Sequence, residues 1–159
     1  MLAKVISSAV MGIEACLVEV EVDISHGLPA FTTVGLAETA VKESRERVKS
    51  AIINSGYTFP YDRITVNLAP ADLKKEGTGF DLPIALGILA ASGQISADLL
   101  EKYLIMGELS LDGTVHPVRG VLPIAISARK EGFKGFILPA ANANEAAIVS
   151  ELDVIPVET

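Results

Sequence analysis

The residues best suited to chemistry lie together at positions 74–81, where the sequence reads KKEGTGFD. Gly77 and Gly79 permit backbone angles that are closed to other residues. Asp81 precedes an apolar segment with Pro83 in its first turn, so we expect it to cap the amides at a helix start. Those amides, with Lys74 and its neighbour, would form a seat for an anion or carboxylate. The alternative is a well-capped structural loop.

Two kinds of catalytic site do not fit this stretch. ATP hydrolysis needs the loop GxxxxGK[ST], whose amides and lysine hold the phosphates, and the sequence has no such run. In the nearest match Lys75 precedes the glycines, and Glu76 would repel a triphosphate at short range. His116 lies beside Pro117, and no Ser or Cys stands in a nucleophile-elbow context. We therefore expect no catalytic residue and no bound ATP.

A metal site is equally unsupported by the sequence. The lone Cys16 falls on the apolar side of an alternating segment, which is typical of a small core residue. With only His26 and His116 besides, no cluster has zinc-like spacing. We expect no metal and no cofactor in this chain.

The loop at 74–80 is expected to join a strand to a core helix. Residues 63–68 alternate in strand fashion and Pro70 stops them, which delivers the chain to the loop. Residues 82–91 carry apolar side chains all round a helix axis, as expected of a helix that is covered on every side. Gly93 closes that helix.

The remaining elements make a mixed α and β chain. Residues 38–54 form an amphipathic helix whose charged face carries Lys42, Arg45, Arg47 and Lys49. We interpret that face as solvated, with contact to a neighbouring subunit as the alternative. Strands are expected at 2–10 and 14–24, which Met11 and Gly12 join, and at 31–34, 104–111, 114–118, 135–138 and 154–157. Helices are expected at 122–130 and 144–150, with one helical turn at 98–102. We predict an α+β sandwich of a mixed sheet with packed helices.

Length and charge narrow the class of protein. A chain of 159 residues is the size of one domain. Its net charge of −7 opposes non-specific attraction to phosphate backbones, so any DNA contact would have to be local. No apolar run approaches the ~20 residues that span a bilayer, and the N-terminus has no signal region. We expect a soluble, cytoplasmic protein without membrane contact.

Three long runs resemble one known family. They read GLPAFTTVGLAETAVKESRERVKSAIINSGYTFP, RITVNLAPADLKKEGTGFDLPIALGILAASGQI and GELSLDGTVHPVRGVLPIAISARKEGF, and they span nearly the whole chain. Together they resemble the N-terminal domain of the ComM/YifB family of magnesium-chelatase-like AAA+ ATPases. In that family the domain precedes an ATPase module and a helical domain. The resemblance therefore implies that residues 1–159 are one N-terminal domain, and that ATP and magnesium belong to a downstream module.

The family is distantly similar to the Lon protease domain, whose fold is shared with part of the RadA ATPase and with a ribosomal protein domain. The Lon loop K-D-G-P-S-A-G matches residues 75–81 and places Gly79 where the nucleophilic serine would stand. The second Lon signature matches residues 107–122 and places Leu122 where the catalytic lysine would stand. Glycine and leucine supply neither a hydroxyl nor a proton acceptor. The resemblance thus implies a Lon-like fold without the Ser–Lys dyad.

The function implied is that of a non-catalytic domain in a ring-forming, hexameric ATPase that acts in DNA branch migration during natural transformation. Its partners would be other subunits of the same ring and DNA, which the isolated domain would bind weakly. The candidate contacts for an anion or DNA are Lys74, Lys75, Arg63 and Arg119, beside the loop residues Gly77, Thr78 and Gly79. One alternative is an unusual peptidase in which Thr78 is the nucleophile and a nearby lysine the base. Another is a pure oligomerisation module, which the acidic net charge favours.

Overall fold

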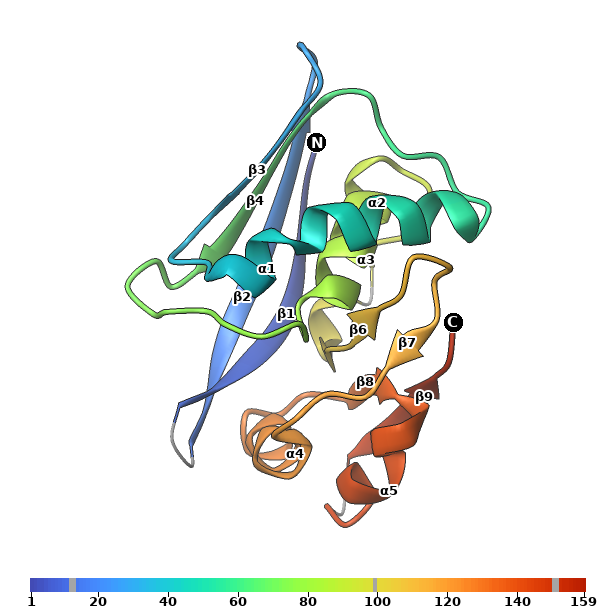
Figure 1. Ribbon diagram of the computed structural model, residues 1–159. Coiled ribbons are helices and arrows are strands. Elements are labelled where there is room, and N and C mark those ends of the chain that lie inside the picture. The colour runs from blue at the N-terminus through green and yellow to red at the C-terminus, as the bar shows by residue number, and fades with distance from the viewer. Residues whose placement is uncertain (12–13, 99, 150–151) are drawn as a thin grey trace.

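The computed structural model describes residues 1–11, 14–98, 100–149 and 152–159 (Figure 1). Seven strands form one mixed sheet in the order β3-β4-β2-β1-β5-β8-β9. Their bounds are β1 Leu2–Met11, β2 Glu14–Ser25, β3 Ala30–Val34, β4 Arg63–Ala69, β5 Tyr103–Ile105, β8 Gly135–Pro139 and β9 Asp153–Val157. A separate antiparallel pair is made by β6 Glu108–Leu109 and β7 Val115–His116. The helices are α1 Thr39–Lys42, α2 Ser44–Asn54, α3 Asp81–Ala91, α4 Val121–Lys130 and α5 Ala143–Ala146, with 3₁₀ turns at Leu100–Lys102 and Ala140–Asn142.

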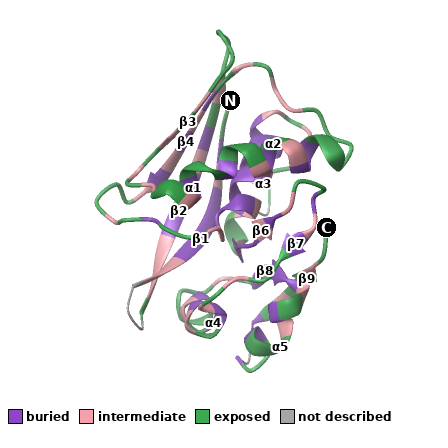
Figure 2. Cartoon of the chain, viewed as in Figure 1, coloured by how far each residue is buried: buried purple, intermediate pink, exposed green. Residues whose placement is uncertain are grey.

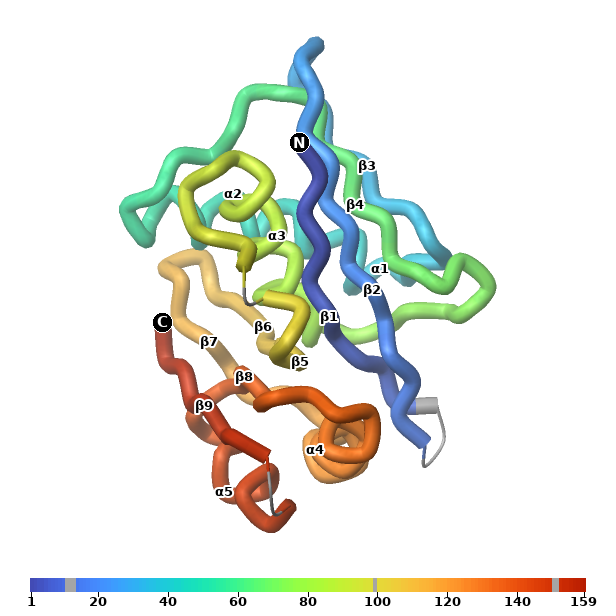
Figure 3. The backbone as a smooth tube through the Cα atoms, turned by 180° about the vertical axis from the view of Figure 1, so that it is seen from behind, coloured from blue at the N-terminus to red at the C-terminus, as the bar shows by residue number. Residues whose placement is uncertain are grey.

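Side chains alternate in direction along the strands, and apolar side chains on both faces form one core on each face of the sheet. In β2, Val18, Val20 and Val22 are fully buried in the cluster that contains α3. Leu17, on the opposite face, packs in the second cluster with residues of α4 such as Ile124. Because successive side chains of a strand point to opposite faces, α2 and α3 cover one face and α4 covers the other. Figure 3, seen from behind, shows β1 and β2 side by side, with α3 next to β1.

The helix α3 is the central element of the first core. Nine of its eleven residues are buried, which agrees with the apolar pattern all round its axis. Its Gly87 lies so close to the sheet that a Cβ there would sit 2.6 Å from Val22 Cγ2. Figure 2 shows the buried residues concentrated in α3 and the facing stretches of β1 and β2. The prediction of a mixed sheet with packed helices is confirmed.

Three predicted elements are divided or shortened in the structure. The helix predicted at 38–54 divides at Glu43 into α1 and α2. The strand predicted at 104–111 divides because the chain leaves the sheet after β5 and pairs again only in β6. The helix predicted at 144–150 is the short α5 after a 3₁₀ turn. Parts of three predicted segments, at Gly12, Leu99 and Ser150, lie outside the described residues.

Candidate functional site

The loop that follows β4 is fixed against the β6 strand. The N–H of Gly107 donates to the Gly79 carbonyl at 3.0 Å, and the N–H of Leu82 donates to the Gly107 carbonyl at 3.0 Å. The Thr78 hydroxyl donates to Glu108 Oε2 at 2.9 Å. These bonds join the loop, the start of α3 and β6 into one unit, so the loop has a defined position before any ligand arrives.

A cleft of about 500 Å³ opens beside this loop. The end of β1 lines it at residues 8–10, the loop lines it at 76–80, and the segment at 117–119 lines it opposite. Its charged lining residues are Lys74, Glu76, Glu108 and Arg119. The cleft therefore combines charges of both signs with apolar walls that include Met106.

Asp81, which directly follows the cleft-lining Phe80, connects three elements. Its buried carboxylate accepts bonds from Ser44 Oγ at 2.5 Å, from Arg47 Nε at 2.7 Å and Nη2 at 3.0 Å, and from the Leu109 N–H at 3.0 Å. It does not cap its own helix, because α3 has Phe80 at its N-cap position and no side-chain cap bond. The predicted cap is thus corrected: Asp81 joins α2, α3 and β6.

Arg47 is also placed differently from the solvated position that we expected. Its side chain is 20% exposed and makes two bonds to Asp81, and Nη2 also donates to the Ala40 carbonyl at 2.9 Å. The hydrogen bond to Asp81 raises the pKa of Arg47, and the charges of Glu108 and Glu43 act in the same direction. Arg47 therefore stays charged at any ordinary pH, and its bonds to Asp81 form a structural contact between α2 and α3.

Lys75 is turned into the protein and away from the cleft. Its side chain is fully buried and its amine donates to the Pro70 carbonyl. Burial lowers the pKa of Lys75, because it penalises the charged amine, and the charge of Asp72 partly opposes this. Its backbone N–H donates to the Leu36 carbonyl at 2.9 Å. In this arrangement an anion in solvent does not reach the Lys75 amine.

The other three candidate cations lie in different places. Lys74 and Arg119 both line the cleft. The Lys74 side chain is 61% exposed, with Nζ 3.3 Å from Glu38 Oε1. Arg63 is the first residue of β4, whereas the loop follows the last, so a strand of this length separates them by about 20 Å. The structure brings Lys74 and Arg119 together and leaves Arg63 and Lys75 apart from them, and anion binding at the cleft stays a prediction.

The structure describes both residues that stand at the positions of the Lon dyad, Gly79 and Leu122. Gly79 lines the cleft, where a Cβ would meet Met106 Cε at 3.3 Å. Leu122 lies in the first turn of α4 with a partly exposed side chain. In the alternative peptidase, Thr78 would need a lysine beside its hydroxyl, but that hydroxyl bonds Glu108. Lys74 and Lys75 are engaged with Glu38 and Pro70 respectively.

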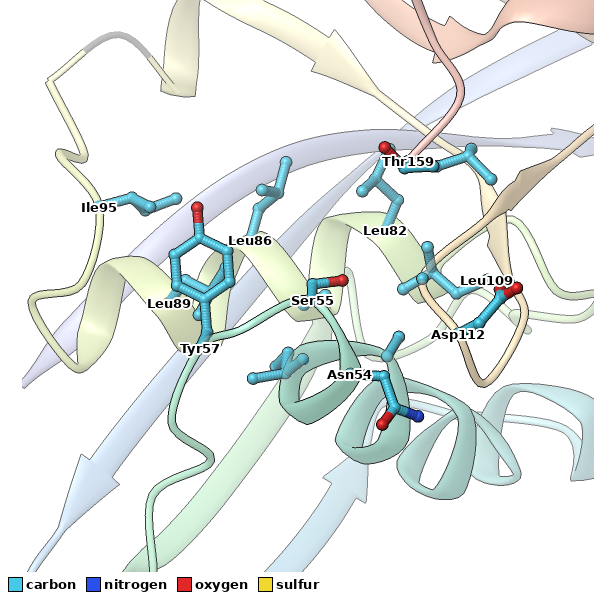
Figure 4. A pocket seen from close by; sticks show the side chains of 15 residues that line it. Asn54, Ser55, Tyr57, Leu82, Leu86, Leu89, Ile95, Leu109, Asp112 and Thr159 are labelled. Carbon is cyan, nitrogen blue, oxygen red and sulfur yellow. The ribbon is translucent and has the colours of Figure 1, made fainter.

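A second pocket of about 500 Å³ lies between α2, α3 and the β6–β7 turn (Figure 4). Its lining is largely apolar, with Tyr57, Leu86, Leu89 and Ile95 around one end, as the close view shows. Thr159 lines the other end, where the Val115 N–H donates to the Glu158 carbonyl at 2.8 Å. Sequence reasoning missed this pocket, because its lining comes from segments far apart in the chain.

Two properties of the described residues bear on the class of protein. None of their helices has the length and apolar character needed to cross a membrane. The same residues contain no group of three or more His, Cys, Asp or Glu side chains placed to hold a metal ion.

Comparison with known proteins gives three kinds of match. A family model described as subunit ChlI of Mg-chelatase matches residues 20–142. Competence protein ComM of Haemophilus influenzae is 51% identical over 150 residues, which cover 94% of this chain and 29% of that protein. The uncharacterized protein YifB of Escherichia coli is 50% identical over 149 residues, which cover 94% of this chain and 29% of that protein. A Lon protease of Chloroflexus aurantiacus is 29% identical over 129 residues, or 77% of this chain and 15% of the protease. The chain thus spans less than a third of the relatives that it matches.

Proposed function

We propose a function from one premise: the chain belongs to the family of the ChlI subunit of Mg-chelatase. Its similarity to competence protein ComM extends over 94% of its length. The proposal is that this chain is a non-catalytic domain of a ComM-like, ring-forming AAA+ ATPase that takes part in DNA branch migration. The observation that carries it is that Gly79, which lines the cleft, and Leu122, in the first turn of α4, stand at the two positions that match the Lon nucleophile and base.

The proposed role of the cleft is a local contact to DNA phosphate. Lys74 and Arg119 supply the two cations that line it, and Arg119 has no ion pair among the described residues. Binding by the isolated chain would be weak because its net charge is −7. A ring would hold several copies close together, so that weak contacts would act jointly. ATP and magnesium would bind a downstream module of the parent protein.

The test measures how DNA affinity depends on salt. Binding of a labelled DNA duplex to this chain is followed by fluorescence anisotropy at several salt concentrations, for the wild type and for Lys74→Ala with Arg119→Ala. Each lost phosphate contact lowers the slope of log affinity against log salt by about 0.9, so the double variant should lose up to about 1.8. The matched control is Arg63→Ala with Lys130→Ala, which removes the same charge away from the cleft. Equal slopes in wild type and cleft variant, or a larger loss in the control, would contradict the proposed contact.

A peptidase is the second candidate, because the Thr78 hydroxyl bonds a carboxylate inside a cleft and the chain has the Lon similarity described above. We expect no turnover of unfolded protein substrates by the isolated chain. Turnover that disappears in Thr78→Ala would establish the peptidase and overturn the main proposal. A chain that assembles into oligomers but shows no salt-dependent DNA binding would instead indicate an oligomerisation module.

A further inference from the structure

The β3 strand leaves one edge of the sheet open. Among the strands that the structure describes, β3 is outermost and pairs only with β4 (Figure 1). The Ala30 N–H donates to the Asp62 carbonyl at 3.4 Å, which sets which backbone groups face β4. Because the direction alternates along a strand, the N–H and C=O groups of Phe31 and Thr33 point outward. The edge therefore presents two donors and two acceptors to an incoming strand.

The opposite edge of the sheet is protected. In β9 the Asp153 N–H donates to the Lys134 carbonyl at 3.3 Å, so the same alternation turns Val154 and Pro156 outward. Proline has no N–H, and such a residue blocks pairing at a sheet edge. β3 reads AFTTV and contains neither proline nor a charged residue. Strand addition is therefore favoured at β3 and disfavoured at β9.

A row of cations follows the open edge. Lys42, Arg45 and Lys49 are spaced three and four residues apart, and Glu43 keeps a right-handed helical conformation between α1 and α2, so the three share one side. Three adjoining hollows of about 590, 310 and 340 Å³ lie between this row and the edge. The first two share Thr33 and Lys42, and the last two share Phe31 and Arg45. Together they form one groove along β3, which we call the β3 groove.

The β3 groove carries one more cation than acids although the chain is acidic overall. Its lining includes the cations Lys42, Arg45, Lys49 and Lys74 and the acids Glu38, Glu46 and Asp62. The Arg45 side chain is 55% exposed and its nearest acid, Glu46, is itself exposed at 73%. Lys42 is exposed and has no ion pair among the described residues. Lys49 lies over the Phe59 ring, with Nζ 5.8 Å from the centroid. Such charges select an acidic partner and increase its rate of encounter.

The groove fits a peptide better than a nucleic acid. Phe31 and Phe59 stack on each other with centroids 6.4 Å apart, both pack against the first core, and Lys49 lies over Phe59. These rings are therefore engaged within the protein, whereas base stacking needs free ring faces. The outward amides of β3 are suited to pairing with another polypeptide backbone. We propose that the β3 groove binds an extended acidic segment of a partner protein, which adds a strand to β3 and directs its carboxylates toward Lys42, Arg45 and Lys49.

The two-residue period of side chains in a strand predicts the sequence pattern of the acidic partner segment. Alternate residues of an added strand lie on one face about 7 Å apart, so acidic residues at every second position would face the cation row. The probe is a fluorescein-labelled octapeptide that alternates glutamate with valine or threonine. Its control is the same peptide with glutamine in place of glutamate.

The experiment measures anisotropy of both peptides with this chain. We expect binding of the glutamate peptide only, with affinity reduced about tenfold or more by Lys42→Glu with Arg45→Glu. The matched charge control is Lys102→Glu with Lys130→Glu, which should leave affinity unchanged. Thr33→Pro, which removes one outward N–H and blocks the edge, should abolish binding while circular dichroism confirms the fold.

Hydrogen exchange on the wild-type chain gives an independent readout if Thr33→Pro does not fold. The peptide should slow exchange of the Phe31 and Thr33 amides. Binding without that protection, or binding that Thr33→Pro leaves intact, would overturn strand addition. Tighter binding of a single-stranded oligothymidylate with the same dependence on Lys42 and Arg45 would overturn the choice of a peptide.

Discussion

Replacement of Asp81 by asparagine removes the charge of the buried network while it preserves the side-chain volume. The carboxylate accepts four bonds, two of them from Arg47, which retains only 20% exposure. Removal of one partner of a buried ion pair costs about 3–5 kcal/mol, because it leaves a charge without compensation. Since Arg47 keeps partial contact with water, we expect a loss of about 2–4 kcal/mol in Asp81→Asn.

The assay is urea unfolding followed by circular dichroism, with a thermal scan alongside. For a domain of this size a loss of about 3 kcal/mol lowers Tm by about 6–12 °C. The surface control is Glu46→Gln, which removes an exposed pair with Arg45 at 3.2 Å and should cost under about 1 kcal/mol.

A double-mutant cycle separates the ion pair from other effects at Asp81. If the pair is the cause, Asp81→Asn should cost much less when Arg47 is already methionine, because no uncompensated guanidinium then remains. An equal cost in both backgrounds, or a cost no larger than that of Glu46→Gln, would refute the reasoning.

Two further variants test the surroundings of the cleft. Burial lowers the pKa of Lys75 in the folded state, so between that lowered pKa and the ordinary value of 10.5 the unfolded chain binds more protons than the folded chain, and stability should rise with pH over that interval. Urea midpoints for wild type and Lys75→Met at pH 7 to 10 check this. A rise that persists in Lys75→Met would contradict it. Asn142 bridges the Val118 N–H and C=O at 2.9 and 3.1 Å, so Asn142→Ala should leave both groups unpaired and cost about 1–3 kcal/mol. Hydrogen exchange at the Val118 amide should then accelerate, and unchanged exchange would remove Asn142 from the support of the cleft wall.

Local sequence patterns predicted the helices and strands of this fold, but they did not predict the contacts between distant segments. The alternation in β2 and the apolar surface of α3 are local, and both elements lie within one residue of the predicted bounds. The Arg47–Asp81 pair joins residues 34 apart, and no periodic pattern reports such a contact. One local sign existed: Ser44 falls three residues after Val41 and four before Val48, within the apolar stripe of the helix. A polar residue at that place indicates a buried hydrogen bond.

Lys75 shows the same contrast between local pattern and tertiary contact within the candidate site. Two adjacent lysines before glycines are typical of a solvated loop, and Lys74 is indeed exposed. Lys75 is buried because the loop folds back on residues 36–38, where its N–H and C=O bond Leu36 and Glu38. That return of the chain depends on tertiary packing, which no local sequence pattern reports. For this reason we predicted both lysines on one surface.

Lys74 belongs to two hollows at once, since it lines both the cleft beside Thr78 and the end of the β3 groove beside Glu38. One ammonium group cannot pair fully with an anion in each hollow at the same time. A ligand that draws Lys74 into the cleft would withdraw positive charge from the groove, and an acidic strand in the groove would withdraw it from the cleft. The two proposed occupants would therefore compete for one side chain, and by thermodynamic reciprocity each would weaken the other by the same factor.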